Sequence, residues 1–226
     1  MKKVFSFVSM LAIAGAVSAG TPTIDGTFDG VGVWGTAIAT DASADGWGGA
    51  DATNLYVTQD ATYLYLGAEC VNSDWMSFGF TINTTTGGGN TEDPWAYRVN
   101  FNYPDAPDFV LRGNNDNGWR ELRTWNGSDW STGSGVDLGA TESNVSATFI
   151  ECRIPLATLG IAGLQNINVG FFLTGNNSAE HGCFDQIPSG TGDTTADNWN
   201  EAGTSNVLNE ATAALVPVEL DSFMID

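Results

Sequence analysis

Tryptophan is the residue type whose number and placement in this chain most suggest binding chemistry. The chain has eight tryptophans, and Trp119, Trp125 and Trp130 fall within one short polar stretch. A flat indole covers the apolar C–H face of a sugar ring at little entropic cost, and nearby Asn, Asp and Arg side chains bind the hydroxyls. Those polar residues surround these tryptophans. The pattern predicts a carbohydrate-binding surface.

The tryptophans divide into structural and exposed candidates. Trp34 lies beside the expected first strand and Trp125 begins a Trp-Asn-Gly turn, so we assign both a structural role. Trp119 and Trp130 are expected to be exposed platforms, with Trp95 in a polar stretch as a third; a structural role is the alternative. For the arginines, neutralisation of neighbouring carboxylates is the alternative to sugar binding. The predicted sugar-binding residues are Trp95, Trp119, Trp130, Arg98, Arg120 and Asn117.

One loop has the oxygen spacing of a calcium site. Asp41, Ser43 and Asp45 occupy positions 1, 3 and 5, the turn glycine Gly46 follows, and Asp51 lies close to where an acidic ligand would close the loop. Calcium takes about six to eight oxygen ligands, and this spacing supplies several of them. The usual closing glutamate is missing. We therefore predict a structural Ca²⁺ held by these four side chains, the alternative being an Asx-rich surface loop without metal.

The sequence gives little support to the hypothesis that the protein is an enzyme. His181 is the only histidine, which excludes sites that need two, and no Gly-x-Ser-x-Gly elbow is present. The 27 acidic residues leave a glycosidase carboxylate pair open as an alternative, but no pair is singled out. Glu69 and Glu151, the carboxylates within expected strands, are expected to face solvent. We predict a protein that is not an enzyme.

The charge balance excludes further classes of function. The chain has 7 basic and 27 acidic residues, with a formal net charge of −20. A chain this acidic repels nucleic-acid phosphates and anionic lipid headgroups, so no nucleic-acid partner is expected. Its two lysines are Lys2 and Lys3, so the body of the chain offers no lysine for a Schiff base or a phosphate-binding loop.

The N-terminal residues have the pattern of an export signal. Lys2 and Lys3 precede an apolar run over 4–17 and the small-residue site Val17-Ser18-Ala19, as in a signal peptide covering 1–19. The run is short for a membrane span, so we predict a secreted, extracellular or cell-surface protein. Of the cysteines, Cys70 and Cys152 are expected in the core and Cys183 in a loop, with a disulfide as the alternative.

The positioning scaffold is expected to be all-β. Short apolar runs separated by Gly, Thr, Asn and Asp predict one antiparallel two-sheet β-sandwich over 20–214, jelly-roll or immunoglobulin-like, with one helical turn near 155–159. A hairpin is expected over 54–68, turning at Asp60. Long polar loops between strands would carry the binding residues. The clearest of the expected strands are 54–58, 63–69, 76–82, 97–102, 109–112, 146–154 and 167–174.

Three segments together resemble the family 9 carbohydrate-binding modules and the wider DOMON-like sandwich superfamily. They are Ile24 to Asp29 with Trp34, the hairpin Leu55 to Gly67, and Glu151 to Leu156 with Leu159-Gly160. The resemblance implies two antiparallel sheets packed face to face, in a group whose members bind sugars, bind haem or do neither. Residues 215–226 resemble a linker to a surface-sorting domain of secreted bacterial proteins.

The leading hypothesis is therefore a secreted, non-catalytic carbohydrate-binding β-sandwich whose partner is a polysaccharide or glycan. The first alternative is an acidic surface or matrix protein that self-assembles. The second is a haem b domain, because Met76 and His181 resemble, in order, the axial Met and His of cytochrome domains in extracellular flavocytochromes. A core methionine and a solvated histidine are the other interpretation of that pair.

Overall fold

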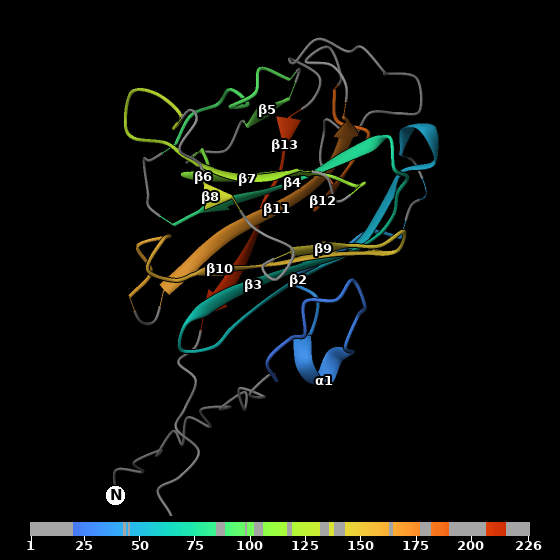
Figure 1. The fold of residues 1–226 in the computed structure, drawn as a ribbon, viewed down its shortest axis with the longest axis horizontal. Coiled ribbons are helices and arrows are strands. Elements are labelled where there is room, and N and C mark those ends of the chain that lie inside the picture. Colours follow the sequence, from blue (N-terminus) through green and yellow to red (C-terminus); the bar gives the residue numbers. More distant parts are fainter. Residues whose placement is uncertain are drawn as a thin grey trace, which may run out of the picture.

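Two antiparallel β-sheets lie face to face across a shared hydrophobic core (Figure 1). The all-β, two-sheet sandwich expected from the sequence is confirmed. The computed structural model describes residues 20–42, 44, 46–84, 89–97, 99–101, 106–116, 119–131, 136–137, 143–162, 165–176, 182–189 and 207–215.

The first sheet has five strands and contains the expected hairpin. Its neighbouring strands β2 and β3 pair antiparallel, with Gln59 opposite Leu64, and the Asp60 carboxylate accepts the backbone N–H groups of Thr62 and Tyr63 at 2.7 and 2.8 Å. The Asp60 turn is thus confirmed. In spatial order the strands are β1 (Ala39–Thr40), β2 (Asp51–Gln59), β3 (Tyr63–Val71), β10 (Phe149–Pro155) and β9 (Ser143–Val145).

The second sheet has seven strands and is centred on the long strand β11. One half of β11 pairs with β12 and the other half with β14, while β4 runs along its opposite edge. In order, the strands are β12 (Asp185–Ile187), β11 (Gln165–Gly175), β4 (Met76–Asn83), β6 (Phe109–Asn114), β7 (Arg120–Thr124) and β8 (Val136–Asp137), with β14 (Ala211–Leu215) on β11. Two further short strands, β5 (Asn100–Phe101) and β13 (Val207–Leu208), pair parallel.

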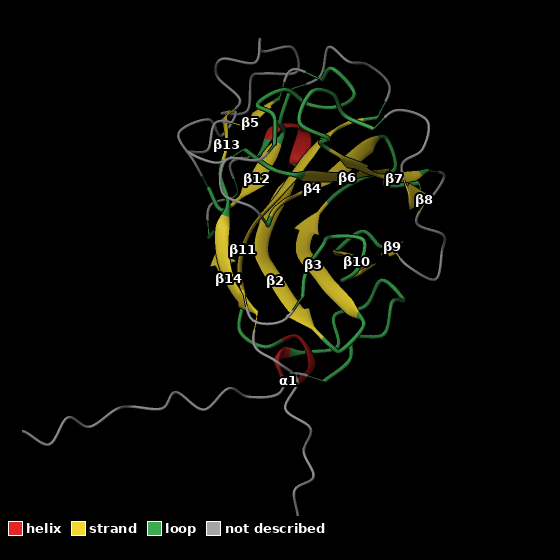
Figure 2. Cartoon of the chain, turned by 90° about the vertical axis from the view of Figure 1, so that its left-hand side faces the viewer, coloured by secondary structure: helices red, strands yellow, loops and turns green. Residues whose placement is uncertain are grey.

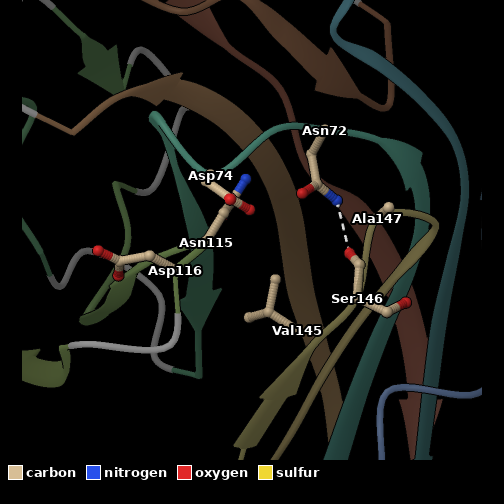
Figure 3. Close-up of a pocket in the computed structure, with 7 residues that line it drawn as sticks. All are labelled: Asn72, Asp74, Asn115, Asp116, Val145, Ser146 and Ala147. Carbon is tan, nitrogen blue, oxygen red and sulfur yellow. Dashed lines mark hydrogen bonds between the residues drawn. The ribbon is translucent and has the colours of Figure 1, made fainter.

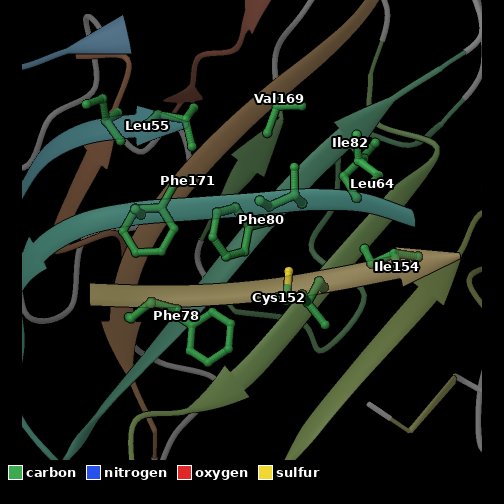
Figure 4. Close-up of a cluster of buried hydrophobic side chains, with 14 of the residues drawn as sticks. Leu55, Leu64, Phe78, Phe80, Ile82, Cys152, Ile154, Val169 and Phe171 are labelled. Atoms are coloured by element: carbon green, nitrogen blue, oxygen red, sulfur yellow. The ribbon is translucent and has the colours of Figure 1, made fainter. Parts of the chain in front are cut away.

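The core between the sheets follows from strand alternation. Phe78, Phe80 and Ile82 of β4 point toward Cys152 and Ile154 of β10 (Figure 4), because every second side chain of a strand faces the same side. Cys70 and Cys152 lie in this core, as expected, and Cys183 is also buried in the loop before β12. None of the three cysteines forms a disulfide in the structure. Burial raises the pKa of the Cys70 thiol to about 12, which keeps it unreactive.

Both sheets are also covered on their outer faces. On the first sheet, Trp34 packs on Tyr56 and Phe149, and Gly67 makes the space, since a Cβ there would lie 2.9 Å from the Trp34 ring. On the second sheet, Phe101 and Trp130 cluster with Val110 and Phe172. The outward-facing residues of the central strands are therefore shielded from solvent, which decides where several charged residues lie.

The helical elements differ from the single turn expected near 155–159. Residues 156–160 form consecutive hydrogen-bonded turns, with the Thr158 N–H donating to the Pro155 carbonyl at 2.9 Å. The helices proper are α1 (Val31–Trp34), at one end of the sandwich, and η1 (Trp47–Gly49), near the opposite end (Figure 2). Neither of these two helical elements of the described chain has the length or apolar character that crossing a membrane requires.

Candidate functional site

Trp95 and Trp119 meet edge to face on the outer side of the second sheet. Their ring centroids are 5.5 Å apart, with an interplanar angle of 89°. Trp119 is 36% exposed and is the most exposed of the described tryptophans, whereas Trp95 is half-buried. The perpendicular rings thus present one open indole, supported by a second that is anchored in the fold. We call Trp95, Trp119, Glu121 and Arg123 the aromatic face.

A tight turn fixes Trp95. The backbone N–H of Ala96 donates to the Asp93 carbonyl at 2.9 Å, and the Asp93 carboxylate accepts the N–H groups of Trp95 and Tyr97 at 2.9 and 3.1 Å. Pro94 suits the second position of such a turn because its φ is pre-set. Ala96 has φ 57°, in the left-handed region. Asp93 therefore fixes the backbone at Trp95 and at Tyr97, and with it the position of the Trp95 ring.

Asp93 is itself held by a buried arginine. Its carboxylate lies 3.5 Å from Nη1 of Arg112, and the two side chains are 0% and 1% exposed. The Arg112 guanidinium lies 3.7 Å from the Tyr97 ring centroid and 5.5 Å from that of Trp95. Burial raises the pKa of Asp93, while Arg112 and the two N–H donors act in the opposite direction. The Asp93–Arg112 ion pair packs against the rings of Tyr97 and Trp95, and Trp95 in turn contacts the exposed Trp119.

Arg123 and Glu121 give the aromatic face polar groups. Both alternate with the core residue Leu122 on β7, so they lie on the outer side of the sheet. The Arg123 guanidinium sits 4.3 Å from the Trp95 ring centroid, donates to the Pro94 carbonyl at 2.6 Å and pairs with Glu121 at 3.1 Å. This arrangement combines an open ring with a fixed cation and a carboxylate, which are groups that can contact C–H faces and hydroxyls.

The prediction that Trp130 is an exposed platform is wrong. Trp130 is 9% exposed, and its indole N–H donates to the Glu92 carbonyl at 3.0 Å. Its ring packs at 5.6 Å against Trp125, its partner in an isolated antiparallel bridge. Both tryptophans pack onto the outer face of the sheet, in the cluster with Val110 and Phe172. The structural assignments hold for Trp34 and for Trp125.

Arg120 does not join the aromatic face. It shares the inner side of β7 with Leu122, and its Cγ lies where a Cβ on Gly113 would come within 2.8 Å. Burial lowers its pKa. Alternation places Arg120 and Trp119 on opposite sides of the sheet. Sugar contact by Arg120 therefore stays a prediction that the aromatic face does not support. Two other predicted sugar-binding residues, Arg98 and Asn117, lie outside the described residues.

The calcium prediction is covered only in part. Ser43 and Asp45 lie outside the described residues, Asp41 accepts a hydrogen bond from the Ser189 hydroxyl, and Asp51 begins β2. Among the residues that the structure describes, no group of three or more His, Cys, Asp or Glu side chains is placed to hold a metal. The calcium loop stays a prediction.

The haem alternative rests on one described residue. Met76 begins β4 and is fully buried in the core between the sheets. His181 lies outside the described residues. The burial of Met76 fits the interpretation of a core methionine, and the haem pair itself stays a prediction.

The expectation that Glu151 faces solvent is wrong. The residue is 0% exposed because the segment before α1 crosses the outer face of the first sheet. Its Oε1 accepts the backbone N–H groups of Asp25 and Gly26 at 2.7 and 2.5 Å. Burial raises its pKa to about 7, and the nearby carboxylates of Asp25 and Asp29 add to this. Glu69 is half-buried, and its Oε2 accepts a hydrogen bond from the Tyr56 hydroxyl at 3.0 Å.

No protein-family model matches the chain, and neither does any curated protein. The site therefore rests on its own geometry. Sequence reasoning missed Asp93, Arg112 and Arg123 as supports of the aromatic face. The Asp-Pro-Trp turn over 93–95 was the one local signal for them, since an aspartate before a proline favours a turn that caps the following N–H groups.

Proposed function

We propose that this protein is a secreted, non-catalytic module that binds a glycan through the aromatic face. The observation that carries the proposal is the exposed Trp119 ring, set perpendicular to Trp95 beside the Arg123–Glu121 pair. A sugar ring would lay its C–H face on Trp119, displacing water from both apolar surfaces. Its hydroxyls would reach the guanidinium, which donates hydrogen bonds to them, and the carboxylate, which accepts hydrogen bonds from them.

The fixed geometry of the aromatic face supports this function. Trp95 is held by the Asp93 turn, and Arg123 is held by both Pro94 and Glu121. Groups that are already in place lose little conformational entropy when a ligand binds. Stacking and hydrogen bonding require no reacting group, so the proposal assigns binding and no reaction. Export through residues 1–19 and a structural Ca²⁺ at the loop beginning with Asp41 complete it.

The Trp119→Ala variant is expected to lose at least about tenfold in glycan affinity, because truncation of an exposed aromatic anchor removes most of the stacking energy. The measurement is a pull-down of the mature chain, with calcium, against a panel of insoluble and soluble polysaccharides. Val71→Ala is the control, since Val71 is another exposed apolar residue but lies on the first sheet. It is expected to bind as the parent does.

Retention on no polysaccharide would overturn the proposal, as would equal retention of the parent and Trp119→Ala. Concentration-dependent assembly in place of retention would support the self-assembling surface protein. A Soret band on addition of haem would support the haem-binding alternative. Competition by the free sugar would confirm that retention reflects glycan binding.

A further inference from the structure

A polar cleft of about 220 Å³ opens between the two sheets, apart from the aromatic face. Its walls are the connection from β3 to β4, the residues after β6, and the connection from β9 to β10 (Figure 3). The β3–β4 connection joins the two sheets, the residues after β6 follow a strand of the second sheet, and the β9–β10 connection lies within the first sheet. The lining residues are Asn72, Asp74, Asn115, Asp116, Val145, Ser146 and Ala147.

Asn115 is the unusual residue of this cleft. It is 5% exposed, and neither Nδ2 nor Oδ1 of its amide has a hydrogen-bond partner among the described residues. Its backbone is held in place because its N–H donates to the Met76 carbonyl at 3.0 Å. A buried amide without partners opposes folding, so a donor and an acceptor placed together in a cleft point to a ligand that satisfies both.

The neighbouring side chains complete a mixed surface. The Asn72 amide donates from Nδ2 to the Ser146 carbonyl at 2.8 Å, which turns its Oδ1 toward the cleft (Figure 3). Asp74 lines the cleft together with Asn115, and the methyl groups of Val145 lie between the two walls (Figure 3). The cleft therefore offers one amide donor, several oxygen acceptors and an apolar patch.

This combination selects among ligand classes. A bare cation would satisfy Oδ1 of Asn115 and leave Nδ2 without a partner. An anion would be repelled by Asp74 and Asp116. A hydroxyl group both donates and accepts, so two neighbouring hydroxyls can bond to both atoms of one primary amide, while the C–H groups between them contact a valine.

We infer that this cleft is a second sugar site, in which Asn115 binds a pair of neighbouring ring hydroxyls. Asp74 and Asn72 accept further hydroxyl protons there, and Val145 contacts the ring carbons. The site does not depend on the aromatic face, since Trp119 lies on the outer side of the second sheet and the cleft lies between the sheets.

The test uses saturation-transfer NMR with millimolar glucose, galactose, mannose and xylose. The parent for this test is the Trp119→Ala variant, so that only binding elsewhere than the aromatic face is detected. Adding Asn115→Leu, which keeps the size and removes the amide, is expected to reduce the transfer about tenfold. It should leave the melting temperature unchanged or higher, because a buried amide without partners is replaced by an apolar group.

Asp74→Ala is the second variant and is expected to fold normally, because Asp74 is exposed. It should reduce the transfer severalfold without changing the melting temperature. The inference is overturned if no sugar gives transfer in the Trp119→Ala parent, or if both cleft variants leave the transfer unchanged. A lower melting temperature in Asn115→Leu, with normal transfer in Asp74→Ala, would assign Asn115 a structural role and also overturn it. If Ca²⁺ without sugar stabilises the protein and Asn115→Leu abolishes this effect, the cleft binds a cation and the sugar proposal is overturned.

Discussion

Replacing Arg112 with leucine is expected to lower the free energy of unfolding by about 3–5 kcal/mol, the usual cost of removing one partner of a buried ion pair. The carboxylate of Asp93 would remain fully buried, with its cation gone and two backbone N–H groups as its partners. The guanidinium would also be lost from the Tyr97 ring, 3.7 Å away. Urea denaturation at pH 8 measures the change.

A second substitution identifies the cause of that loss. Asp93→Asn keeps an oxygen for the Trp95 and Tyr97 N–H groups but removes the charge. The Arg112→Leu/Asp93→Asn double variant is therefore expected to be more stable than Arg112→Leu alone. Acidification should likewise reduce the loss in Arg112→Leu, because burial raises the pKa of Asp93 and its neutral form costs less to bury. A double variant that is less stable than Arg112→Leu would contradict the ion-pair account.

Glu151→Gln is expected to remove a large part of the pH dependence of stability between pH 4.5 and pH 7. The pKa of Glu151 is raised from 4.5 to about 7 in the fold. Between these values the folded protein binds a proton that the unfolded chain does not, so rising pH removes stability. For one group shifted this far the loss is about 3 kcal/mol. Glutamine is neutral at every pH and can still accept the Asp25 and Gly26 N–H groups.

The measurement is the free energy of unfolding at several pH values for both proteins. The variant is expected to exceed the parent in stability at pH 8 by up to about 3 kcal/mol and to match it more closely at pH 4.5. Some decline with pH should remain, because the pKa of Asp93 is also raised. Parallel curves for the two proteins would show that Glu151 does not titrate in this range.

The strands that pack on the core could be predicted from the sequence because alternation is a local signal. The hairpin of β2 and β3, and the strands β4, β10 and β11, each contain four or more alternating or continuous apolar positions. Three of the two-residue strands, β1, β8 and β13, contain too few residues for any period to be read and lie outside the strands expected from the sequence. Their positions depend on partners far along the chain.

The outer faces of the sheets could not be predicted in the same way. Alternation correctly places Glu151 and Arg112 on the side away from the core, but it does not reveal that other segments cover that side. For the same reason, Trp130 reads as an exposed loop residue and is in fact packed on a covered sheet face. Trp95 and Trp119 are 24 positions apart in the sequence. They meet because the fold brings the turn that carries Trp95 next to Trp119, which no local pattern reveals.

The most direct test of glycan binding at the aromatic face is a titration followed by the indole N–H signals of the ¹⁵N-labelled protein. With a polysaccharide fragment that the pull-down selects, the Trp119 and Trp95 signals, assigned from single Trp→Phe variants, are expected to shift together and saturably. The Trp34 signal should not move, because Trp34 is buried against the outer face of the first sheet, far from the aromatic face. A saturable shift confined to other tryptophans, or no shift at saturating ligand, would contradict the account.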